Sequence, residues 1–281
     1  MTSGLDWSGR VGDVWAEQWR RTERSFTHLT AHLDAAIAAV APRRGRALDI
    51  GCGVGSTGLA LRAARPELDV VGVDLSPEML ALAGTRAVDV EGRGGALRFV
   101  CGDAVSVAAS EGPFDLFVSR HGVMFFPDPV AAFTGLRAAA SPGAAMVFSC
   151  FDERARNGFA TLADEAVGHS PTPAAGYEPG PFAFADSHRV GAWLEQAGWA
   201  LEVAARVDFE YVVGQGAAPI EDAVDFLSRI GPAARAMATA APDERARIAA
   251  ALHEGLSHHR TGDQVALPAS AWIWRVRAGA A

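Results

Sequence analysis

A turn rich in glycine follows a short apolar run near residue 50. Asp49 lies within the run, and Gly51, Gly53 and Gly55 follow it at alternate positions. Glycine has no Cβ and tolerates positive φ, so a turn of this kind lets the backbone approach a ligand closely. At the start of a helix, the same turn directs free N–H groups at that ligand. The spacing therefore predicts a ligand-binding loop between a first strand and a first helix.

The carboxylates around this loop decide between two kinds of cofactor. The run from Gly53 to Gly58 also fits the glycine pattern of NAD-binding folds, and Asp74, at the end of the second strand, suits the ribose of either cofactor. Asp49 lies where an NAD-binding strand normally continues apolar, and there a carboxylate suits the ammonium of an amino-acid-bearing cofactor. Asp103 ends the third strand, where it suits an adenine amino group. The three positions favour the amino-acid-bearing cofactor over NAD, although each Asp alone is also a common helix cap.

Taken together, these motifs resemble those of the class I S-adenosylmethionine-dependent methyltransferases, in the small-molecule, quinone-biosynthesis-like group. The resemblance is clearest from Leu48 to Phe151 and weakens into the stretch from Gly180 to Asp186. It implies S-adenosyl-L-methionine as the cofactor. By this resemblance, the cofactor-binding residues are Asp49 near the amino group, Gly51, Cys52 and Gly53 along the methionine side, Asp74 at the ribose, Leu75 and Met79 beside the adenine, Gly102, Asp103 and Ala104 at the adenine edge, and Ser119 through its carbonyl.

The residues after the fourth predicted strand are the candidates for chemistry. A sulfonium-bound methyl is already activated, so the protein mainly has to align a nucleophile and exclude water. His121 is the candidate catalytic base, with a structural or substrate-orienting role as the alternative. Arg120 suits an acidic substrate group or the cofactor carboxylate, or a salt bridge within its loop. Phe125 and Phe182 are candidate substrate contacts or core anchors.

The methyl acceptor predicted from these side chains is a small, apolar or aromatic molecule. A methylammonium substrate held by cation–π contacts would use similar residues. The acceptor atom stays open among O, N and C.

Residues 46–151 alternate short β-branched runs with longer Ala- and Leu-rich stretches, as repeated βαβ units do. The pattern predicts a Rossmann-like, seven-stranded, mostly parallel sheet flanked by helices, with helical lid insertions. Ligands bind outside the carboxyl ends of strands in such a sheet, so segments leaving that edge are expected to cover a substrate. The predicted strands are Arg46–Gly51, Asp69–Asp74, Leu97–Gly102, Phe114–Ser119 and Gly143–Phe151, and the predicted helices are Ser56–Arg65, Pro77–Val90 and Pro129–Ala139.

Outside this core, one helix is predicted over Val14–Val40 and a long helical stretch over Pro219–Arg260. Further regular elements are a helix over Asp186–Ala197 and strands over Trp199–Val213 and Val265–Val276. The predicted organisation is an N-terminal helical cap (1–45), a cofactor-binding core (46–151), an insertion or lid (152–185), a core helix and strand (186–213), a helical lid segment (214–264) and a final core strand (265–281).

Composition excludes several function classes. The net charge of −8 and the pI near 5.5 oppose binding to a phosphate backbone, so no nucleic-acid partner is expected. All 25 basic residues are Arg, and the absence of Lys removes Schiff-base chemistry. Three widely spaced cysteines fit neither a disulfide framework nor a zinc site. The triplet His253, His258 and His259 is interpreted as a solvated helix end, and no metal is predicted.

The predicted location is the cytoplasm, because no signal segment is visible and no apolar run approaches the roughly 18 residues of a membrane helix. The oligomeric state is left open. Two other functions remain open at this point: an NAD-dependent oxidoreductase, and a non-catalytic S-adenosylmethionine-binding protein with a regulatory or scaffolding role.

Overall fold

A mixed β-sheet forms the centre of the molecule, with strand order β3-β2-β1-β4-β5-β8-β6. The computed structural model describes residues 7–88, 94–169, 171 and 176–279. Strands β1 to β5 run parallel, whereas β8 lies antiparallel to both β5 and β6. The predicted mostly parallel sheet is confirmed, with one addition. A two-residue strand, β7, pairs with β8 and makes the described sheet eight-stranded.

The strands are β1 (Arg44–Ile50), β2 (Glu67–Asp74), β3 (Leu97–Cys101), β4 (Phe114–Arg120), β5 (Ala140–Phe151), β6 (Trp199–Gln215), β7 (Arg260–Thr261) and β8 (Gln264–Ala278). The α-helices are α2 (Arg10–Glu17), α3 (Trp19–Ser25), α4 (Thr27–Ala38), α5 (Ser56–Ala64), α6 (Pro77–Ala87), α7 (Ala104–Glu111), α8 (Pro129–Ala138), α9 (Gly158–Val167), α10 (Ser187–Gln196), α11 (Pro219–Arg229), α12 (Pro232–Thr239) and α13 (Pro242–Ser257), and two short 3-10 helices cover Val123–Phe125 and Arg154–Arg156.

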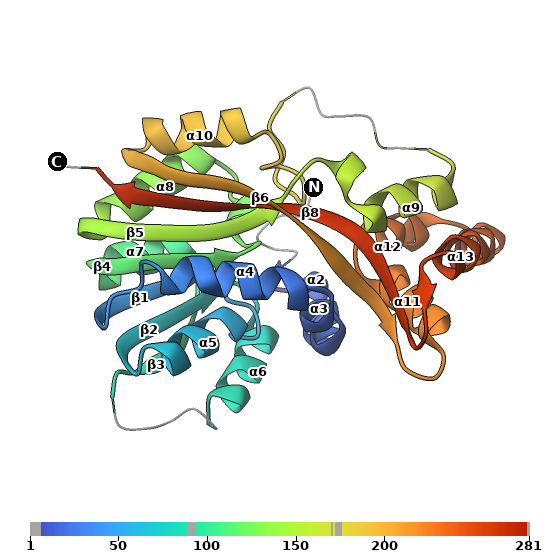
Figure 1. The fold of residues 1–281 in the computed structure, drawn as a ribbon, viewed down its shortest axis with the longest axis horizontal. Helices are drawn as coiled ribbons and strands as arrows, with labels where there is room; N and C mark the ends of the chain where they lie inside the picture. The colour runs from blue at the N-terminus through green and yellow to red at the C-terminus, as the bar shows by residue number, and fades with distance from the viewer. Residues whose placement is uncertain (1–6, 89–93, 170, 172–175, 280–281) are drawn as a thin grey trace.

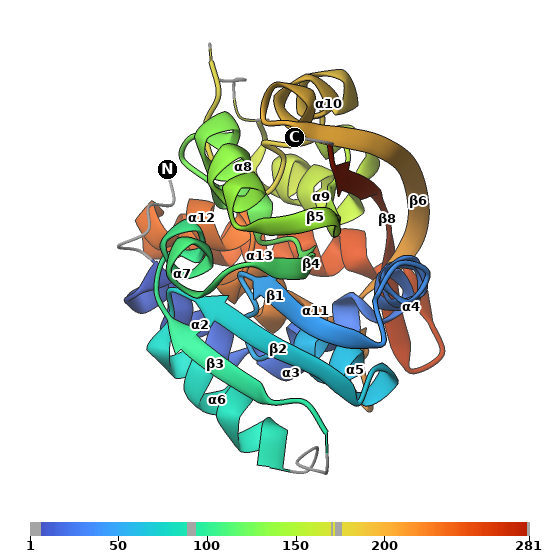
Figure 2. The same ribbon diagram turned by 90° about the vertical axis from the view of Figure 1, so that its left-hand side faces the viewer.

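Helices cover both faces of the sheet, which explains why its central strands are apolar on both sides. Helices α4 and α5 lie on one face, and α7, α8 and α10 lie on the other (Figure 2). Strand β4 consequently has Leu116, Phe117 and Val118 in succession with no exposed surface. The core therefore spans the full thickness of the sheet.

Strands β6 and β8 form a long twisted ribbon that continues past the parallel strands (Figure 1). At its far end the ribbon meets helices α9, α11, α12 and α13 (Figure 1). Helices α2 and α3 lie between this group and the carboxyl ends of the parallel strands (Figure 1). Segments from the start, the middle and the end of the chain thus approach the same edge of the sheet.

The prediction of one helix over residues 14–40 is wrong, because three helices occupy this region. The chain leaves the helical conformation at Gln18 (φ −93°, ψ 11°) and again at Phe26 (φ −96°, ψ 2°). Each break changes the direction of the chain, and α3 and α4 can both pack against β6. The periodic apolar pattern continues across both breaks, so it gave no indication of them.

The predicted helical stretch over residues 219–260 is likewise divided, into α11, α12 and α13. Proline occupies the first position of each helix, where its missing N–H costs no hydrogen bond, and Gly231 (φ 93°) separates the first two helices. Helix α9 lies within the predicted insertion or lid (152–185), for which no individual helix was predicted, and α7 was not predicted at all. The last residues of the predicted helix over 77–90, at 89–90, lie outside the described part of the chain. No helix in the described residues is both long and apolar enough to cross a bilayer.

Candidate functional site

The glycine turn between β1 and α5 has the geometry expected of a binding loop. Gly51, Gly53 and Gly55 have φ values of 61°, 54° and 78°, a region that other residues rarely adopt. A Cβ on Gly51 would lie 3.0 Å from the Cα atom of Gly122, in the loop after β4. A Cβ on Gly122 would in turn lie 2.6 Å from the carbonyl oxygen of Ile50. The two loops therefore pack backbone against backbone at the sheet edge.

Asp74, the last residue of β2, holds this turn in place. Its Oδ2 accepts a hydrogen bond from the Gly53 N–H at 2.8 Å, and its Oδ1 accepts one from the Ser76 N–H at 2.9 Å. Burial raises the pKa of the carboxyl, and the backbone donors oppose that rise. A carboxylate oxygen can accept more than one hydrogen bond, so Asp74 retains capacity for ribose hydroxyls while it fixes the loop.

Asp49 lies inside β1, directly before the glycine turn, and its exposed fraction is 1%. Its Oδ2 accepts a hydrogen bond from the Gly58 N–H at 2.9 Å, whereas its Oδ1 is buried without a partner. Burial raises the pKa of Asp49 to about 7, although the Gly58 N–H and the Arg120 guanidinium both act to lower it. A buried, half-satisfied carboxylate is costly in isolation, and an ammonium group beside it would remove that cost. Asp49 therefore fits the amino group of S-adenosylmethionine.

The raised pKa of Asp49 predicts a pH-dependent affinity for S-adenosylhomocysteine. In the unliganded protein the carboxyl is mostly protonated below pH 7, and an ammonium ligand requires the ionised form. Affinity should therefore fall by up to about tenfold per pH unit below 7 and level off above it. Calorimetric titration from pH 5.5 to 8.5 checks this, with Asp49→Asn as the control that should give a weaker and flat profile. An equally flat profile in the unmodified protein would show that Asp49 does not face the amino group.

The residues predicted to hold the adenine lie at the ends of β2 and β3. Asp103 caps α7, where its Oδ1 accepts hydrogen bonds from the N–H and the hydroxyl of Ser106, at 2.8 and 2.9 Å. Its Oδ2 makes no hydrogen bond among the described residues. The helix-cap role weighed from the sequence is thus present, and it leaves one oxygen for a ligand. Met79 packs over the turn, since its Cε atom lies 2.6 Å from the position of a Cβ on Gly53. The remaining predicted adenine contacts, Leu75, Gly102 and Ala104, flank these residues in the chain.

Ser119 and Cys52 are buried beside the turn. The Ser119 hydroxyl donates to the Ile50 carbonyl at 2.8 Å and accepts from the Gly122 N–H at 3.2 Å, which ties the end of β4 to the end of β1. Burial raises the pKa of the Cys52 thiol well above its ordinary value, so this side chain is an inert packing group rather than a nucleophile.

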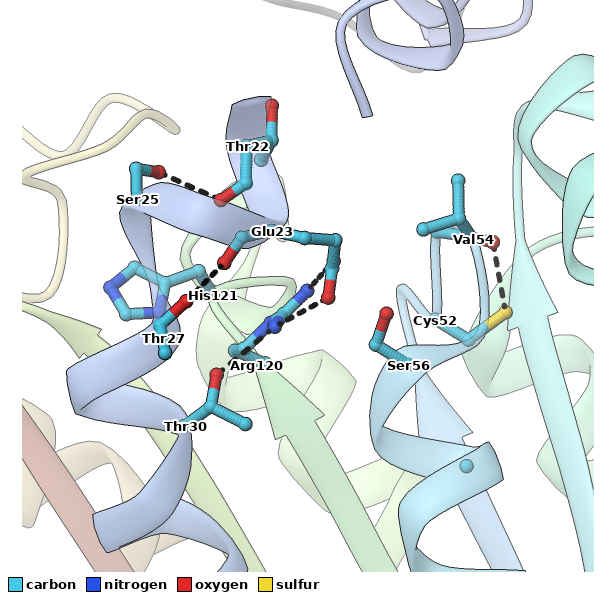
Figure 3. Close-up of polar contacts among 12 residues, drawn as sticks. Thr22, Glu23, Ser25, Thr27, Thr30, Cys52, Val54, Ser56, Arg120 and His121 are labelled. Carbon is cyan, nitrogen blue, oxygen red and sulfur yellow. Dashed lines mark hydrogen bonds and ion pairs between the residues drawn. The ribbon is translucent and has the colours of Figure 1, made fainter. Parts of the chain in front are cut away.

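An ion pair links the N-terminal helices to the end of β4. The Arg120 guanidinium pairs with the Glu23 carboxylate of α3 and donates to the Thr30 hydroxyl at 3.2 Å (Figure 3). Burial would raise the pKa of Glu23, but the charge and hydrogen bonds of Arg120, together with Ser56 and Arg86, outweigh burial and hold this pKa below its usual value. Arg120 forms a salt bridge, as the sequence allowed, but its partner lies 97 positions away rather than within the loop. A substrate carboxylate could reach Arg120 only by competing with Glu23.

Helix α3 also contacts the glycine turn indirectly, through Arg86 of α6. Arg86 of α6 donates to the Val54 carbonyl at 2.5 Å and to the Ser56 hydroxyl at 2.9 Å, and its guanidinium stacks 4.8 Å from the Trp19 ring centroid. Figure 3 shows Glu23 and Arg120 facing Cys52 and Ser56 of the turn. The N-terminal segment therefore closes over the predicted methionine side of the cofactor.

His121 follows β4 directly and is the only non-glycine residue with positive φ in the described part of the chain, at 63°. Its Nδ1 lies 2.9 Å from the Ser149 hydroxyl oxygen, and its Nε2 is buried without a partner. Burial, assisted by the Arg120 charge, lowers the pKa of His121 to about 3. A general base works best with a pKa near the working pH, so this geometry favours the orienting role over the base role.

A group of aromatic rings from five segments packs beside His121, and two of the rings contact the imidazole. The ring centroids of Phe26 and Phe151 lie 4.8 and 4.2 Å from the imidazole centroid, and further rings pack on these two at 5.0 to 6.3 Å. We call this group the aromatic cluster, and it consists of Phe26, Phe151, Phe159 of α9, Phe182 and Tyr211 of β6. Phe182 is therefore connected to His121 through the ring of Phe151. Phe125 does not belong to this group, because it packs edge-on against Trp7 at 5.0 Å.

The residues of this region that were missed from the sequence include Glu23, Phe26, Ser149 and Tyr211. None carries a local signal, because each reaches the site through packing between distant segments. Ser149 lies opposite Arg120 in the register of β4 and β5. That register depends on the whole sheet and cannot be read from either strand alone.

The comparisons with known proteins agree with this geometry. Residues 47–143 match the family model described as a methyltransferase domain. The chain is 35% identical over 102 residues to a demethylmenaquinone methyltransferase of Thermus thermophilus, covering 36% of this chain and 45% of that protein. It is 29% identical over 137 residues to a trans-aconitate 2-methyltransferase of Methylobacterium radiotolerans, covering 49% of each. The chain thus matches less than half the length of either relative.

Similarity to solved structures extends over most of the chain, but only at the level of the fold. A putative methyltransferase from Bacillus halodurans superposes with a TM-score of 0.58 at 15% identity, over 89% of this chain and 100% of that one. The cyclase SpnF superposes with a TM-score of 0.55 at 18% identity, over 89% and 82%. Both support the Rossmann-like architecture described above.

Proposed function

We propose that this chain, whose core is a class I S-adenosylmethionine-dependent methyltransferase domain, transfers a methyl group to a small organic acceptor. The observation that carries the proposal is the unpartnered, buried Oδ1 of Asp49 beside a turn with three glycines at positive φ. An NAD-binding site has no use for a carboxylate at that point of the first strand. The alternative function, an NAD-dependent oxidoreductase, thus gives no role to Asp49.

When bound, S-adenosylmethionine supplies a methyl group already activated by its sulfonium. The residues of the turn, Gly51, Cys52 and Gly53, would line its methionine part, with Asp49 and the Ser119 carbonyl at the ammonium. Asp74 would hold the ribose, and the residues at the adenine would be Leu75, Met79, Gly102, Asp103 and Ala104.

The remaining task of the protein is to orient the methyl acceptor and exclude water. His121, and Phe182 of the aromatic cluster, support a role in orienting the acceptor, since they lie where the N-terminal segment, β5 and the insertion meet. Arg120 would contact the acceptor or the cofactor carboxylate if its ion pair with Glu23 opened. Phe125, which packs edge-on against Trp7, would be a further substrate contact. An apolar or aromatic acceptor fits these side chains best.

The proposal extends to the organisation and the setting of the chain. Residues 46–151 would bind the cofactor, 186–213 and 265–281 would complete the sheet, and 1–45, 152–185 and 214–264 would cover the substrate. The acidic net charge supports a small-molecule substrate over a nucleic acid. The three cysteines are free, which supports a reducing, cytoplasmic location.

A second candidate is a protein that binds the cofactor without transferring its methyl group. It is favoured by one observation, the fold that the chain shares with the [4+2]-cyclase SpnF. Incubation with S-adenosylmethionine labelled at the methyl group, over a panel of aromatic and carboxylate acceptors, separates the two. Methyl transfer predicts labelled product with an equal amount of S-adenosylhomocysteine. Tight cofactor binding with no turnover over the panel would favour the non-catalytic protein.

A further inference from the structure

Ser149 of β5 holds His121 at two points. The Ser149 carbonyl accepts the His121 backbone N–H at 3.1 Å, and the Ser149 hydroxyl meets Nδ1 of the ring at 2.9 Å. Left-handed backbone is unfavourable for a non-glycine residue, and such strain persists where the surroundings enforce it. These two contacts fix both the backbone and the ring of His121.

The proton in the Ser149–His121 contact can be assigned from the surrounding hydrogen bonds. The Ser149 side chain is fully buried, and its hydroxyl has no other hydrogen-bond partner among residues 7–88, 94–169, 171 and 176–279. If Nδ1 donated to the hydroxyl oxygen, the hydroxyl proton would stay buried without an acceptor, which destabilises that arrangement. When the hydroxyl donates to Nδ1 instead, both atoms are satisfied. The neutral imidazole then carries its own proton on Nε2.

The imidazole that carries Nε2 lies against the aromatic cluster, the region proposed above for the methyl acceptor. The Nε2 atom is buried, it has no partner, and the rings of Phe26 and Phe151 lie against the imidazole. Buried donors are nearly always hydrogen-bonded, so an Nε2–H without a protein partner beside the aromatic cluster is available to donate to a ligand atom. The low pKa of His121 agrees with a ring that stays neutral.

We infer that Ser149 is a positioning residue that holds His121 as the Nε2–H tautomer, and that His121 thereby selects a substrate with an oxygen that accepts a hydrogen bond. The inference rests on the proposed methyl transfer and narrows its substrate class. A carbonyl, carboxylate or phenolate oxygen attached to an apolar or aromatic body satisfies the Nε2–H and packs against the aromatic cluster. An ammonium group has only donors, so it would leave Nε2–H unpaired even though the rings suit a cation.

The tautomer can be measured without cofactor or turnover, by the 15N NMR shifts and ring couplings of His121 in the purified chain. We expect a protonated Nε2 and an unprotonated Nδ1 that accepts a hydrogen bond. The Ser149→Ala variant should lose this Nδ1 signature, and Ser149→Thr, which keeps the hydroxyl, should retain it. A protonated Nδ1 in the unmodified protein overturns the inference, whether or not the protein transfers methyl groups.

Substrate selection is tested with matched ligands. An aromatic carboxylate and its aminomethyl counterpart are titrated into the chain saturated with S-adenosylhomocysteine. The carboxylate should bind at least about tenfold more tightly, and that preference should shrink in Ser149→Ala and return in Ser149→Thr, while S-adenosylhomocysteine affinity stays unchanged. Equal binding, or a preference for the ammonium ligand, contradicts the assignment. Failure of S-adenosylhomocysteine itself to bind contradicts the proposed function instead.

Discussion

Replacement of Gly51 by valine is expected to remove measurable S-adenosylhomocysteine binding, a loss of roughly 100-fold or more, or about 3 kcal/mol. Gly51 has φ 61°, and a Cβ there would lie 3.0 Å from the Cα of Gly122, a backbone atom that cannot move aside cheaply. A β-branched residue in this conformation must distort the turn. The turn would then no longer present its backbone to the methionine part of the cofactor. Isothermal titration calorimetry measures the loss.

Gly84→Ala is the matched control for this variant. Gly84 lies on the exposed side of α6, and a Cβ there meets nothing within 4 Å. The Gly84→Ala variant should bind S-adenosylhomocysteine with the affinity of the unmodified protein. Thermal unfolding checks that the Gly51 variant is folded, and Gly51→Ala provides a milder change if valine prevents folding. A folded Gly51→Val protein with affinity within threefold of normal would refute the assigned role of the turn.

Replacement of Asp74 by alanine should weaken S-adenosylhomocysteine binding by a similar factor, about 100-fold. The change removes the acceptor of two backbone N–H groups, those of Gly53 and Ser76, together with the acceptor proposed for the ribose hydroxyls. Hydrogen bonds to charged groups contribute about 1.5–3 kcal/mol each, and the free energy of unfolding should fall as well. Asp69→Ala is the control at the other end of β2. Asp69 accepts one backbone N–H, that of Ala96, and its loss should leave cofactor affinity unchanged.

The ribose contact of Asp74 is separable from its effect on the loop. S-adenosylhomocysteine that lacks the 2′-hydroxyl should bind the unmodified protein more weakly than the complete ligand does. The Asp74→Ala variant should bind the two ligands with equal affinity. This comparison is a double-mutant cycle between the carboxylate and the hydroxyl. The same penalty for the missing hydroxyl in both proteins would indicate that Asp74 only stabilises the turn.

The strands and the glycine turn could be predicted from the sequence because their signals are local. Short β-branched runs mark β1 to β5, and a turn that needs positive φ at alternate positions almost requires glycine. Asp103 shows the limit of such reasoning. Its position was read mainly for the cofactor, and the helix that it caps, α7, was overlooked. The same residue serves both purposes at the end of a strand.

The substrate side of the site could not be predicted in the same way. Contacts such as Arg120 with Glu23, or His121 with Ser149, join segments whose relative placement depends on the complete sheet. The low pKa of His121 follows from burial, which a single histidine after a strand does not reveal. The sequence therefore gives a prediction of the cofactor edge residue by residue, but it leaves the role of His121 divided between base and orienting group.

The most direct test of the central claim is calorimetric titration of the unmodified chain with S-adenosylhomocysteine and, separately, with NAD. The geometry of Asp49, Asp74 and the glycine turn predicts saturable binding of one S-adenosylhomocysteine per chain and no measurable binding of NAD. Binding of NAD alone would contradict that claim.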